Sequence, residues 1–506
     1  MDRRAFIRSA AGAAALSALR PTAAFAEVTS DGQLPDGIDA VTGEGTGVRI
    51  PRSALADLRA RVRGPILFAS DPGYDEARRL INPAFDRRPA LIVQPTGAAD
   101  IRTAVQFARE HGGLLLAVKC GGHSQSGQST CDRGLLVDLS RFRDVRIDPA
   151  AQRAWVTGGS LLGAVDHETA THELVTPLGT VSHTGVGGLV TGGGFGRLAR
   201  KYGLSIDNLL SVQIVTADGE LRCASTGENP DLFWGVRGGG GNFGIVTSFE
   251  LQLHPMRREV IGGNWIYPIS RSREILTRFG EFAPQASDEL YVGFQMLQPP
   301  GNAAGEMGLE ICYCGPESEY ERAVEPLRRS LGPPAQDTVK RIAYTALQKS
   351  GDVSDPRALA IYLKSGFIPA LGPDLAEAIV ESFTPHPARF TAVFFQSSGG
   401  AIARVSRDAT AFPHRSVLGN LLTAVGWPAG QSGTPHIEAI RALWSGLEPF
   451  TEGFYFNDLD PDHKAKDILS NYQRNLERLT AVKTRYDPSN LFRLNANVKP
   501  ATPRAA

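Results

Sequence analysis

The chain has 506 residues, more than a single hydrophobic core usually organises, so two large structural units are expected. Fifty-three lysines and arginines balance 53 aspartates and glutamates. This neutrality excludes the basic excess typical of nucleic-acid-binding proteins, and it favours chemistry on a small molecule.

The first 26 residues have the pattern of a targeting segment. Arg3 and Arg4 form a pair followed by Phe6, an alanine-rich apolar run continues to Leu19, and small residues at 24–26 resemble a cleavage site. The apolar run is too short to be a stable membrane anchor. We therefore expect a twin-arginine signal over 1–26, export by the twin-arginine translocase, and a periplasmic or secreted protein.

The next 60 residues are expected to form a lead and helices over 27–85. Residues 27–47 are polar and rich in turn formers, which predicts a flexible lead. From residue 88 the pattern alternates between strand and helix. Strands are predicted at 90–93, 114–118 and 135–139, and apolar residues recur at helical spacing between 101 and 108.

The segment 119–124, with the sequence KCGGHS, follows the strand predicted at 114–118. Two glycines let the backbone fold tightly around a ligand, with N–H groups free to meet an anionic group such as a pyrophosphate. His123 ends this turn, where its ring can reach whatever those amides hold. A glycine turn with a solvated histidine is the alternative for this segment taken alone.

Two further glycine clusters follow. Residues 185–196 contain seven glycines, and Gly239, Gly241 and Gly244 match the pattern GxGxxG. A dinucleotide fingerprint needs a strand before it and a helix after it, but the sequence after Gly244 is strand-like. A Rossmann interpretation is therefore rejected.

A second domain is predicted from about 257 to 445, where glycine clusters thin out and runs such as 309–313 and 390–395 predict strands. The last fifty residues return to helix. Cys120 and Cys131 could pair in an exported protein, and the sequence leaves this open. Cys312 and Cys314 are expected on one face of a sheet, and no metal site is predicted.

Taken together, the motifs closely resemble those of the berberine-bridge-enzyme-like flavin oxidases, within the vanillyl-alcohol-oxidase (PCMH-type) superfamily. The resemblance extends from about residue 74 to 500 and rests on motifs in a fixed order. They are RPALI (88–92), KCGGHS (119–124), GVGG (185–188), GGGFG (192–196), RKYGL (200–204), NPDLFW (229–234), GGGGNFG (238–244), DPSNLF (487–492) and NAN (495–497).

This resemblance implies an α+β fold. A PCMH-type FAD-binding domain of two α+β subdomains would span 86–256, and the C-terminal segment 446–500 would return to it. The substrate domain, 257–445, would supply an antiparallel sheet backed by helices. The active site would lie between the two.

The resemblance also implies FAD as cofactor, held by a single covalent link from His123. Many relatives add a cysteine tether four residues before the glycine that matches Gly185, but Val181 occupies that position here. The implied cofactor-binding residues are Lys119, Cys120, Gly121, Gly122, His123, Ser124, Gly127, Gly185, Gly188, Gly192, Ile245, Asn495 and Asn497.

The catalytic residues depart from the best-known relatives. Asp458 stands where many carry a tyrosine, and Gln396, which cannot act as a base, stands where Glu or Tyr is common. Asp458 could serve as general base if burial raises its pKa, with Tyr455 as the fallback. A solvated turn residue is the alternative for Asp458. The small Thr184, before Gly185, leaves room for oxygen, although it could merely cap the turn.

These observations predict an exported FAD-dependent oxidase that transfers hydride from an alcohol or amine to the flavin, with oxygen regenerating the flavin and releasing hydrogen peroxide. The run 182–185 also resembles an oxygenating branch that tailors polyketides, so a monooxygenase is the first alternative. The second is a flavin-binding protein that has lost catalysis, because the familiar bases at 396 and 458 are absent.

Overall fold

The described part of the chain begins with a β-hairpin. The computed structural model describes residues 34–299, 305–352, 355 and 357–502, so the signal predicted over 1–26 lies outside the described residues. The chain divides at Asp36, and the elements below belong to the unit that begins there. None of its described helices is long and apolar enough to cross a bilayer.

The hairpin corrects the prediction of a flexible lead. Strands β1 (Gly37–Val41) and β2 (Gly47–Pro51) pair antiparallel. Alternation buries Ala40 and Ile50 completely, so this polar-looking segment has an apolar face. The Val41 N–H also donates to the Arg133 carbonyl (2.9 Å), which ties the hairpin to the following sheet. Helix α2 (Arg52–Arg61) follows.

A four-stranded sheet leads to the KCGGHS turn. Its order is β3 (Ile66–Leu67), β4 (Leu91–Val93), β6 (Leu135–Asp138) and β5 (Leu116–Lys119), with β6 parallel to both β4 and β5. The three parallel strands are apolar runs because both faces are covered, with α3 (Tyr74–Arg78) and α4 (Ala98–Glu110) packed nearby. The strands predicted at 90–93, 114–118 and 135–139 are confirmed with shifted ends, and so is the helix predicted between the first two.

A five-stranded antiparallel sheet follows. Its order is β11 (Leu221–Ser225), β10 (Leu209–Thr216), β12 (Gly244–Gln252), β8 (Arg153–Thr157) and β7 (Val145–Asp148). Its core includes residues of α5 (Leu162–Ala170), α6 (Val186–Gly192), α8 (Pro230–Val236) and α16 (Leu476–Tyr486). A strand, not a helix, follows Gly244, which confirms the rejection of a Rossmann motif.

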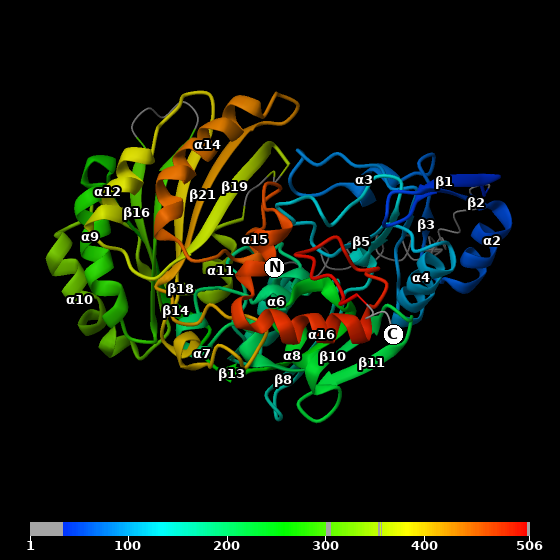
Figure 1. The fold of residues 1–506 in the computed structure, drawn as a ribbon. Coiled ribbons are helices and arrows are strands. Elements are labelled where there is room, and N and C mark those ends of the chain that lie inside the picture. Colours follow the sequence, from blue (N-terminus) through cyan, green and yellow to red (C-terminus); the bar gives the residue numbers. More distant parts are fainter. Residues whose placement is uncertain (1–33, 300–304, 353–354, 356, 503–506) are drawn as a thin grey trace, which may run out of the picture. The chain divides into compact units, whose positions relative to one another are not determined.

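The third sheet has eight antiparallel strands. The main path runs through β17 (Gln336–Asp337), β14 (Glu259–Pro268), β16 (Glu306–Tyr313), β15 (Leu290–Gln298), β20 (Phe390–Ser397), β21 (Gly419–Pro428) and β19 (Leu359–Ile368), and β18 (Lys340–Ala343) pairs with β14. Helices α9 (Ser272–Phe282), α10 (Tyr320–Leu331), α12 (Pro373–Ser382) and α14 (Thr434–Leu447) share a core with one face (Figure 1). The strands predicted within 309–313 and 390–395 are confirmed.

Short elements connect these layers. They are β9 (Leu174–Val175), which pairs with β13 (His254–Pro255), and the helices α7 (Ala199–Tyr202), α11 (Tyr344–Lys349), α13 (Ala401–Arg404) and α15 (Ala465–Asn471). All five cysteines are free thiols. Cys312 and Cys314 lie in one apolar cluster beneath the sheet, as their spacing predicts.

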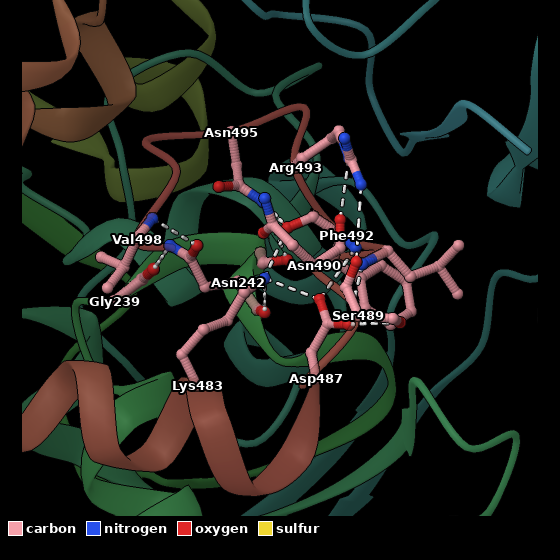
Figure 2. A network of polar contacts seen from close by, with 12 residues as sticks. Gly239, Asn242, Lys483, Asp487, Ser489, Asn490, Phe492, Arg493, Asn495 and Val498 are labelled. Atoms are coloured by element: carbon pink, nitrogen blue, oxygen red, sulfur yellow. Dashed lines mark hydrogen bonds and ion pairs between the residues drawn. The ribbon is translucent and has the colours of Figure 1, made fainter. Parts of the chain in front are cut away.

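The C-terminal segment returns from α16 and is locked by a buried lysine. Figure 2 shows Lys483 pointing toward Asn242 and Asp487. Its Nζ donates to the carbonyls of Asn242 and Phe492, both at 2.8 Å, and to Asp487 Oδ2 at 2.6 Å. Asp487 in turn accepts from the backbone N–H groups of Leu491 and Phe492. This network holds segment 487–498 against the loop at 239–242.

Candidate active site

One cavity brings together most of the predicted site residues. Its volume is about 380 Å³, and its wall comes from the turn after β5, segment 179–192, residues 240–246, Gln396 on β20, residues 455–459 and segment 492–496. The predicted residues that line it are Cys120, Gly121, Gly122, His123, Ser124, Thr184, Gly185, Gly188, Gly192, Ile245, Gln396, Tyr455, Asp458 and Asn495. Parts of the chain more than 300 residues apart thus form one site.

Three predicted residues, Lys119, Gly127 and Asn497, are not among those that line the cavity. Lys119 is buried, donates to the Ala77 carbonyl and lies 3.5 Å from the Asp138 carboxylate. Gly127 adopts a positive φ of 71° against the Phe85 ring, where a side chain would clash. Asn497 has a buried Oδ1 that meets no hydrogen-bond partner among the described residues.

The KCGGHS turn packs against the segment around Gly185 so closely that both need glycine. A Cβ on Gly121 would lie 2.4 Å from the Gly185 amide nitrogen, and one on Gly185 would lie 2.3 Å from Cys120 Sγ. The Cys120 thiol donates to the Gly158 carbonyl at 2.9 Å. Burial raises the pKa of Cys120 to about 11, so this side chain is a neutral packing group at neutral pH.

His123 contacts a second histidine. Its Nε2 lies 2.7 Å from Nδ1 of His183, and the two ring centres are 4.8 Å apart. Burial, followed by the neighbouring His183, lowers the pKa of His123 to about 4. The His123 imidazole is therefore neutral at neutral pH, and one of its ring nitrogens keeps a nucleophilic lone pair.

The segment that carries His183 is held by hydrogen bonds between Ser182 and the Asp352 carboxylate. The backbone N–H of Ser182 donates to Asp352 Oδ1 at 2.9 Å, and the Ser182 hydroxyl donates to the other oxygen of this carboxylate. The Nε2 of His183 is buried and has no partner in the described part of the chain. These two hydrogen bonds to Asp352 therefore fix the position of the segment that carries both His183 and Thr184.

The Asp458 carboxylate is hydrogen-bonded to side-chain amides of the eight-stranded sheet. Asn420 Nδ2, on β21, donates to Asp458 Oδ2 at 2.8 Å and to Gln396 Oε1 at 3.1 Å. Burial raises the pKa of Asp458 to about 7, and the hydrogen bond from Asn420 only partly opposes this. Near neutral pH this carboxyl group can take up or release a proton. The structure thus places it in the environment that a general base requires.

The hydroxyl oxygen of Tyr455, the other candidate base, already accepts hydrogen bonds from the protein. Its hydroxyl oxygen accepts from the backbone N–H groups of Gly194 (2.8 Å) and Phe195 (3.3 Å) and from Asn457 Nδ2 (2.6 Å). Burial also raises the pKa of Tyr455. Three donors converge on this oxygen, so Tyr455 holds the turn at 194–195 in place. The geometry favours Asp458 over Tyr455 for proton transfer.

The glycine-lined part of the wall suits a large flat ligand. No protein atom lies within 4 Å of where a Cβ would be on Gly188 or Gly240, and on Gly241 the nearest is Asn495 Nδ2 at 3.9 Å. A ligand can therefore approach these backbones closely. Asn495 also presents a buried Oδ1 that has no partner among the described residues. These features fit the dinucleotide that the resemblance implies.

One residue of this site, Asn420, has no signal in the sequence. Asn420 joins Gln396 to Asp458 only because β20 and β21 pair in a register that sets Gln396 opposite Asn420. His183 meets His123 across 60 positions of sequence. It stands in the SHT run just before Gly185, where the sequence alone makes it a further titratable candidate.

Comparisons with known proteins agree with this geometry. The family model described as "FAD binding domain" matches residues 89–225, and that described as "Berberine and berberine like" matches 455–499. An FAD-linked oxidoreductase of Dictyostelium discoideum is 34% identical over 437 residues, covering 85% of this chain and 93% of that protein. The (R)-6-hydroxynicotine oxidase of Paenarthrobacter nicotinovorans is 30% identical, covering 87% and 97%.

Solved structures give the same result. The structure of 6-hydroxy-D-nicotine oxidase from Arthrobacter nicotinovorans superposes with a TM-score of 0.79 at 29% identity, covering 87% of this chain and 98% of that one. A chitooligosaccharide oxidase superposes with a TM-score of 0.79 at 25% identity, covering 89% and 100%. The chain therefore belongs to the berberine-bridge-enzyme-like family of FAD-linked oxidoreductases, and FAD is its cofactor.

Proposed function

We propose that this FAD-dependent oxidoreductase is an exported oxidase of small organic alcohols or amines, with oxygen as the second substrate and hydrogen peroxide as the second product. The observation that carries the proposal is the shared cavity of His123, Thr184 and Asp458, in which the half-buried Asp458 has its pKa raised to about 7 by desolvation. Relatives named as oxidases, for hydroxynicotine and for xylooligosaccharides, support this reaction class.

Each residue of the site has its own role in the proposed reaction. Gln396, which lines the cavity, orients the substrate's polar group, and Asn420 holds the Gln396 and Asp458 side chains in position. Ionised Asp458 accepts the proton of the substrate's hydroxyl or amine. Loss of that proton and of a hydride from the same carbon centre turns an alcohol into a carbonyl compound. Bound FAD supplies the redox chemistry of the site, as acceptor of the hydride and donor of electrons to oxygen.

His123 is proposed as the single covalent attachment point of the flavin. Its neutral imidazole can act as a nucleophile, and a tether of this kind raises the flavin's redox potential. Val181 has no nucleophilic side chain, so a second tether is not expected at that position. Thr184 lines the cavity with a small side chain, which supports access of oxygen.

The decisive experiment measures products from purified holoenzyme supplied with a panel of alcohols and amines. An oxidase forms one hydrogen peroxide for each substrate oxidised, and its product contains no label when ¹⁸O₂ is used. Incorporation of one ¹⁸O atom with little peroxide would instead establish the monooxygenase that the run 182–185 resembles. Failure of every substrate to bleach the flavin without oxygen would favour a flavin-binding protein without catalysis.

A further inference from the structure

A second cavity lies beneath the helices of the eight-stranded sheet. Its volume is about 350 Å³, and its wall comes from the end of α12, the residues at the start of β20, β21 and the middle of α14 (Figure 1). Thr391 on β20 pairs with Val425 on β21, which belongs to the core under the helices, so this wall is the helix-covered face. Gln396 points to the opposite face. Among the described residues, none lines both this cavity and the candidate active site.

Arg389 places a cation in this cavity. It precedes β20, lines the cavity and is only 9% exposed. Its guanidinium makes no hydrogen bond or ion pair with any described residue, and its Nε is buried, whereas the two Nη atoms keep accessible surface. A buried arginine is almost always paired, because a charge that leaves water without a partner loses its hydration energy. The Nη atoms of Arg389 are therefore free to bind an anion.

The carboxylates nearest in sequence to the wall do not supply this anion. Glu381 and Glu438 are the neighbours of the wall residues Ser382 and Ala439, and both are exposed. Neither forms an ion pair with Arg389 in the part of the chain that the structure describes. The anion must therefore come from outside the chain's own neighbouring side chains.

The charge of Arg389 also acts on its surroundings. The pKa of His436, on α14, is lowered by burial first and then by the positive charges of Arg389 and His386. Burial lowers the pKa of Arg389 itself. Both shifts agree with a cavity in which positive charge is not neutralised.

Ser382 and Thr384 give the cavity two further polar groups. The Thr384 hydroxyl donates to the Ser382 carbonyl at 3.1 Å, so this carbonyl at the end of α12 already has a donor. The Ser382 hydroxyl is half-buried and has no hydrogen-bond partner among the described residues, so it is free to donate. Arg389 and Ser382 thus offer N–H and O–H donors in one cavity.

A single guanidinium matches a carboxylate better than a sulfate or phosphate. The fork of an arginine meets both oxygens of a carboxylate with two parallel N–H donors, and the two charges cancel. A dianion would keep an uncompensated charge and oxygens without donors. The reachable apolar wall is α14, where Ala439 is half-buried and Ala442 is exposed, and their small side chains leave room. The volume is at the lower end of the roughly 300–1,000 Å³ typical of small-molecule sites.

We infer that this cavity is a binding site for a small organic monocarboxylate. Its carboxylate binds the Nη atoms of Arg389 and accepts from the Ser382 hydroxyl, and its apolar body lies against Ala439 and Ala442 of α14. The site is on the face of the sheet away from Gln396, so it is separate from the proposed oxidase reaction.

The test measures binding to purified holoenzyme by fluorine NMR. The probes are 3,3,3-trifluoropropionate, its neutral amide 3,3,3-trifluoropropionamide, and inorganic sulfate as a competitor. The carboxylate should bind saturably and at least tenfold more tightly than the amide, and sulfate should displace it only at a concentration at least tenfold higher. The visible spectrum of the flavin should not change, because the site is on the other face of the sheet.

Arg389→Met removes the charge, keeps the apolar stem and should weaken binding of the carboxylate at least tenfold. Ala442→Leu, at an exposed position of the wall, narrows the cavity and should weaken binding at least fivefold, so it serves if Arg389→Met does not fold. Arg257→Met is the matched control, because Arg257 is exposed between β13 and β14 and does not line the cavity. Its binding should equal that of the wild type.

Equal binding of the amide, equal competition by sulfate, or equal losses in Arg389→Met and Arg257→Met would overturn the inference. So would a carboxylate that still binds in Arg389→Met while changing the flavin spectrum, because it would then occupy the flavin cavity. Absence of saturable binding to the wild-type holoenzyme would overturn it as well.

Discussion

Asp458 is the residue whose chemistry depends most on its surroundings. An aspartate in water is ionised above pH 4, but burial raises the pKa of Asp458 to about 7, and among the described residues only the Asn420 side chain donates to it in compensation. The side chain therefore changes charge near neutral pH. Its role as a base then depends on pH in a defined direction.

We expect kcat/KM to rise with pH through an apparent pKa of about 7, because only ionised Asp458 accepts a proton. Asp458→Asn should remove this limb of the profile and lower kcat/KM by about 10²–10⁴-fold. Asp374→Asn, at an exposed position in the first turn of α12, should change neither. An unaltered profile in Asp458→Asn would assign the base to another residue.

The contact of His123 with His183 bears on flavin attachment. Two ring nitrogens 2.7 Å apart share one proton, and if Nε2 of His123 carries it, Nδ1 keeps the lone pair that can attack a carbon atom. His183→Ala should therefore slow covalent incorporation of FAD by about tenfold or more while FAD still binds. The measurement is the time course of flavin retained after acid precipitation of apoprotein mixed with FAD.

His172→Ala provides the control for that experiment, since His172 is exposed at the end of α5. Equal rates in the wild type, His183→Ala and His172→Ala would show that His183 has no part in attachment. Incorporation that is slow in His183→Ala only because FAD binds poorly would appear as a loss of total bound flavin, which is measured on the native protein before acid is added.

The sequence predicted part of this site and missed part of it, for physical reasons. His123 and Thr184 stand in motifs of fixed spacing, so local sequence was sufficient to identify them. Asn420 acquires its role only through the pairing of β20 with β21, and no local pattern encodes that register. The environment of Asp458 likewise depends on packing between distant segments.

At the scale of elements, buried polar networks fix the glycine-lined loops. Lys483 on α16 is fully buried, and burial lowers its pKa to about 8 despite the adjacent Asp487. Its three hydrogen bonds join the loop at 239–242 to the segment that carries Asn495 (Figure 2). Asn242 and Asn495 add further hydrogen bonds between the loop and this segment, so Lys483 is the charged member of the network that holds the segment at the cavity.

Lys483→Met should lower the free energy of unfolding by about 3–5 kcal/mol, because Asp487 would remain as a buried charge without its cation. Chemical denaturation followed by tryptophan fluorescence measures this. Lys466→Met, at an exposed position of α15, should cost less than about 0.5 kcal/mol. A similar stability for both variants would mean that the network contributes little.

Among the elements, strands with continuous apolar runs and amphipathic helices were predictable, whereas the β1–β2 hairpin was not. Its strands are short and mostly polar, and only Ala40 and Ile50 are fully buried. The hairpin is held by backbone hydrogen bonds to Arg133 and Leu115, which are remote in sequence. Polar composition alone therefore gave the wrong prediction of a flexible lead.

At the scale of the whole molecule, five separate stretches of chain converge on one cavity, and the eight-stranded sheet adds Gln396. A site lined by segments so far apart in the sequence exists only in the folded protein, so we expect FAD to be bound before export. Export through the twin-arginine translocase is the expectation that follows from Arg3 and Arg4.

Changing Arg3 and Arg4 together to lysine should abolish export, with at least a tenfold loss of the protein from the periplasm or medium and its retention in the cytoplasm. Cell fractionation with an antibody against the protein measures this distribution. Export that continues undiminished in the double variant would show that another signal or pathway carries the protein.

Covalent attachment of FAD to His123 is the central claim, and one measurement tests it most directly. The purified protein is denatured, run on a gel and examined for flavin fluorescence in the protein band. The account predicts fluorescence that survives denaturation in the wild type and disappears in His123→Ala. Release of all flavin from the wild type on denaturation, or an unchanged fluorescent band in His123→Ala, would contradict it.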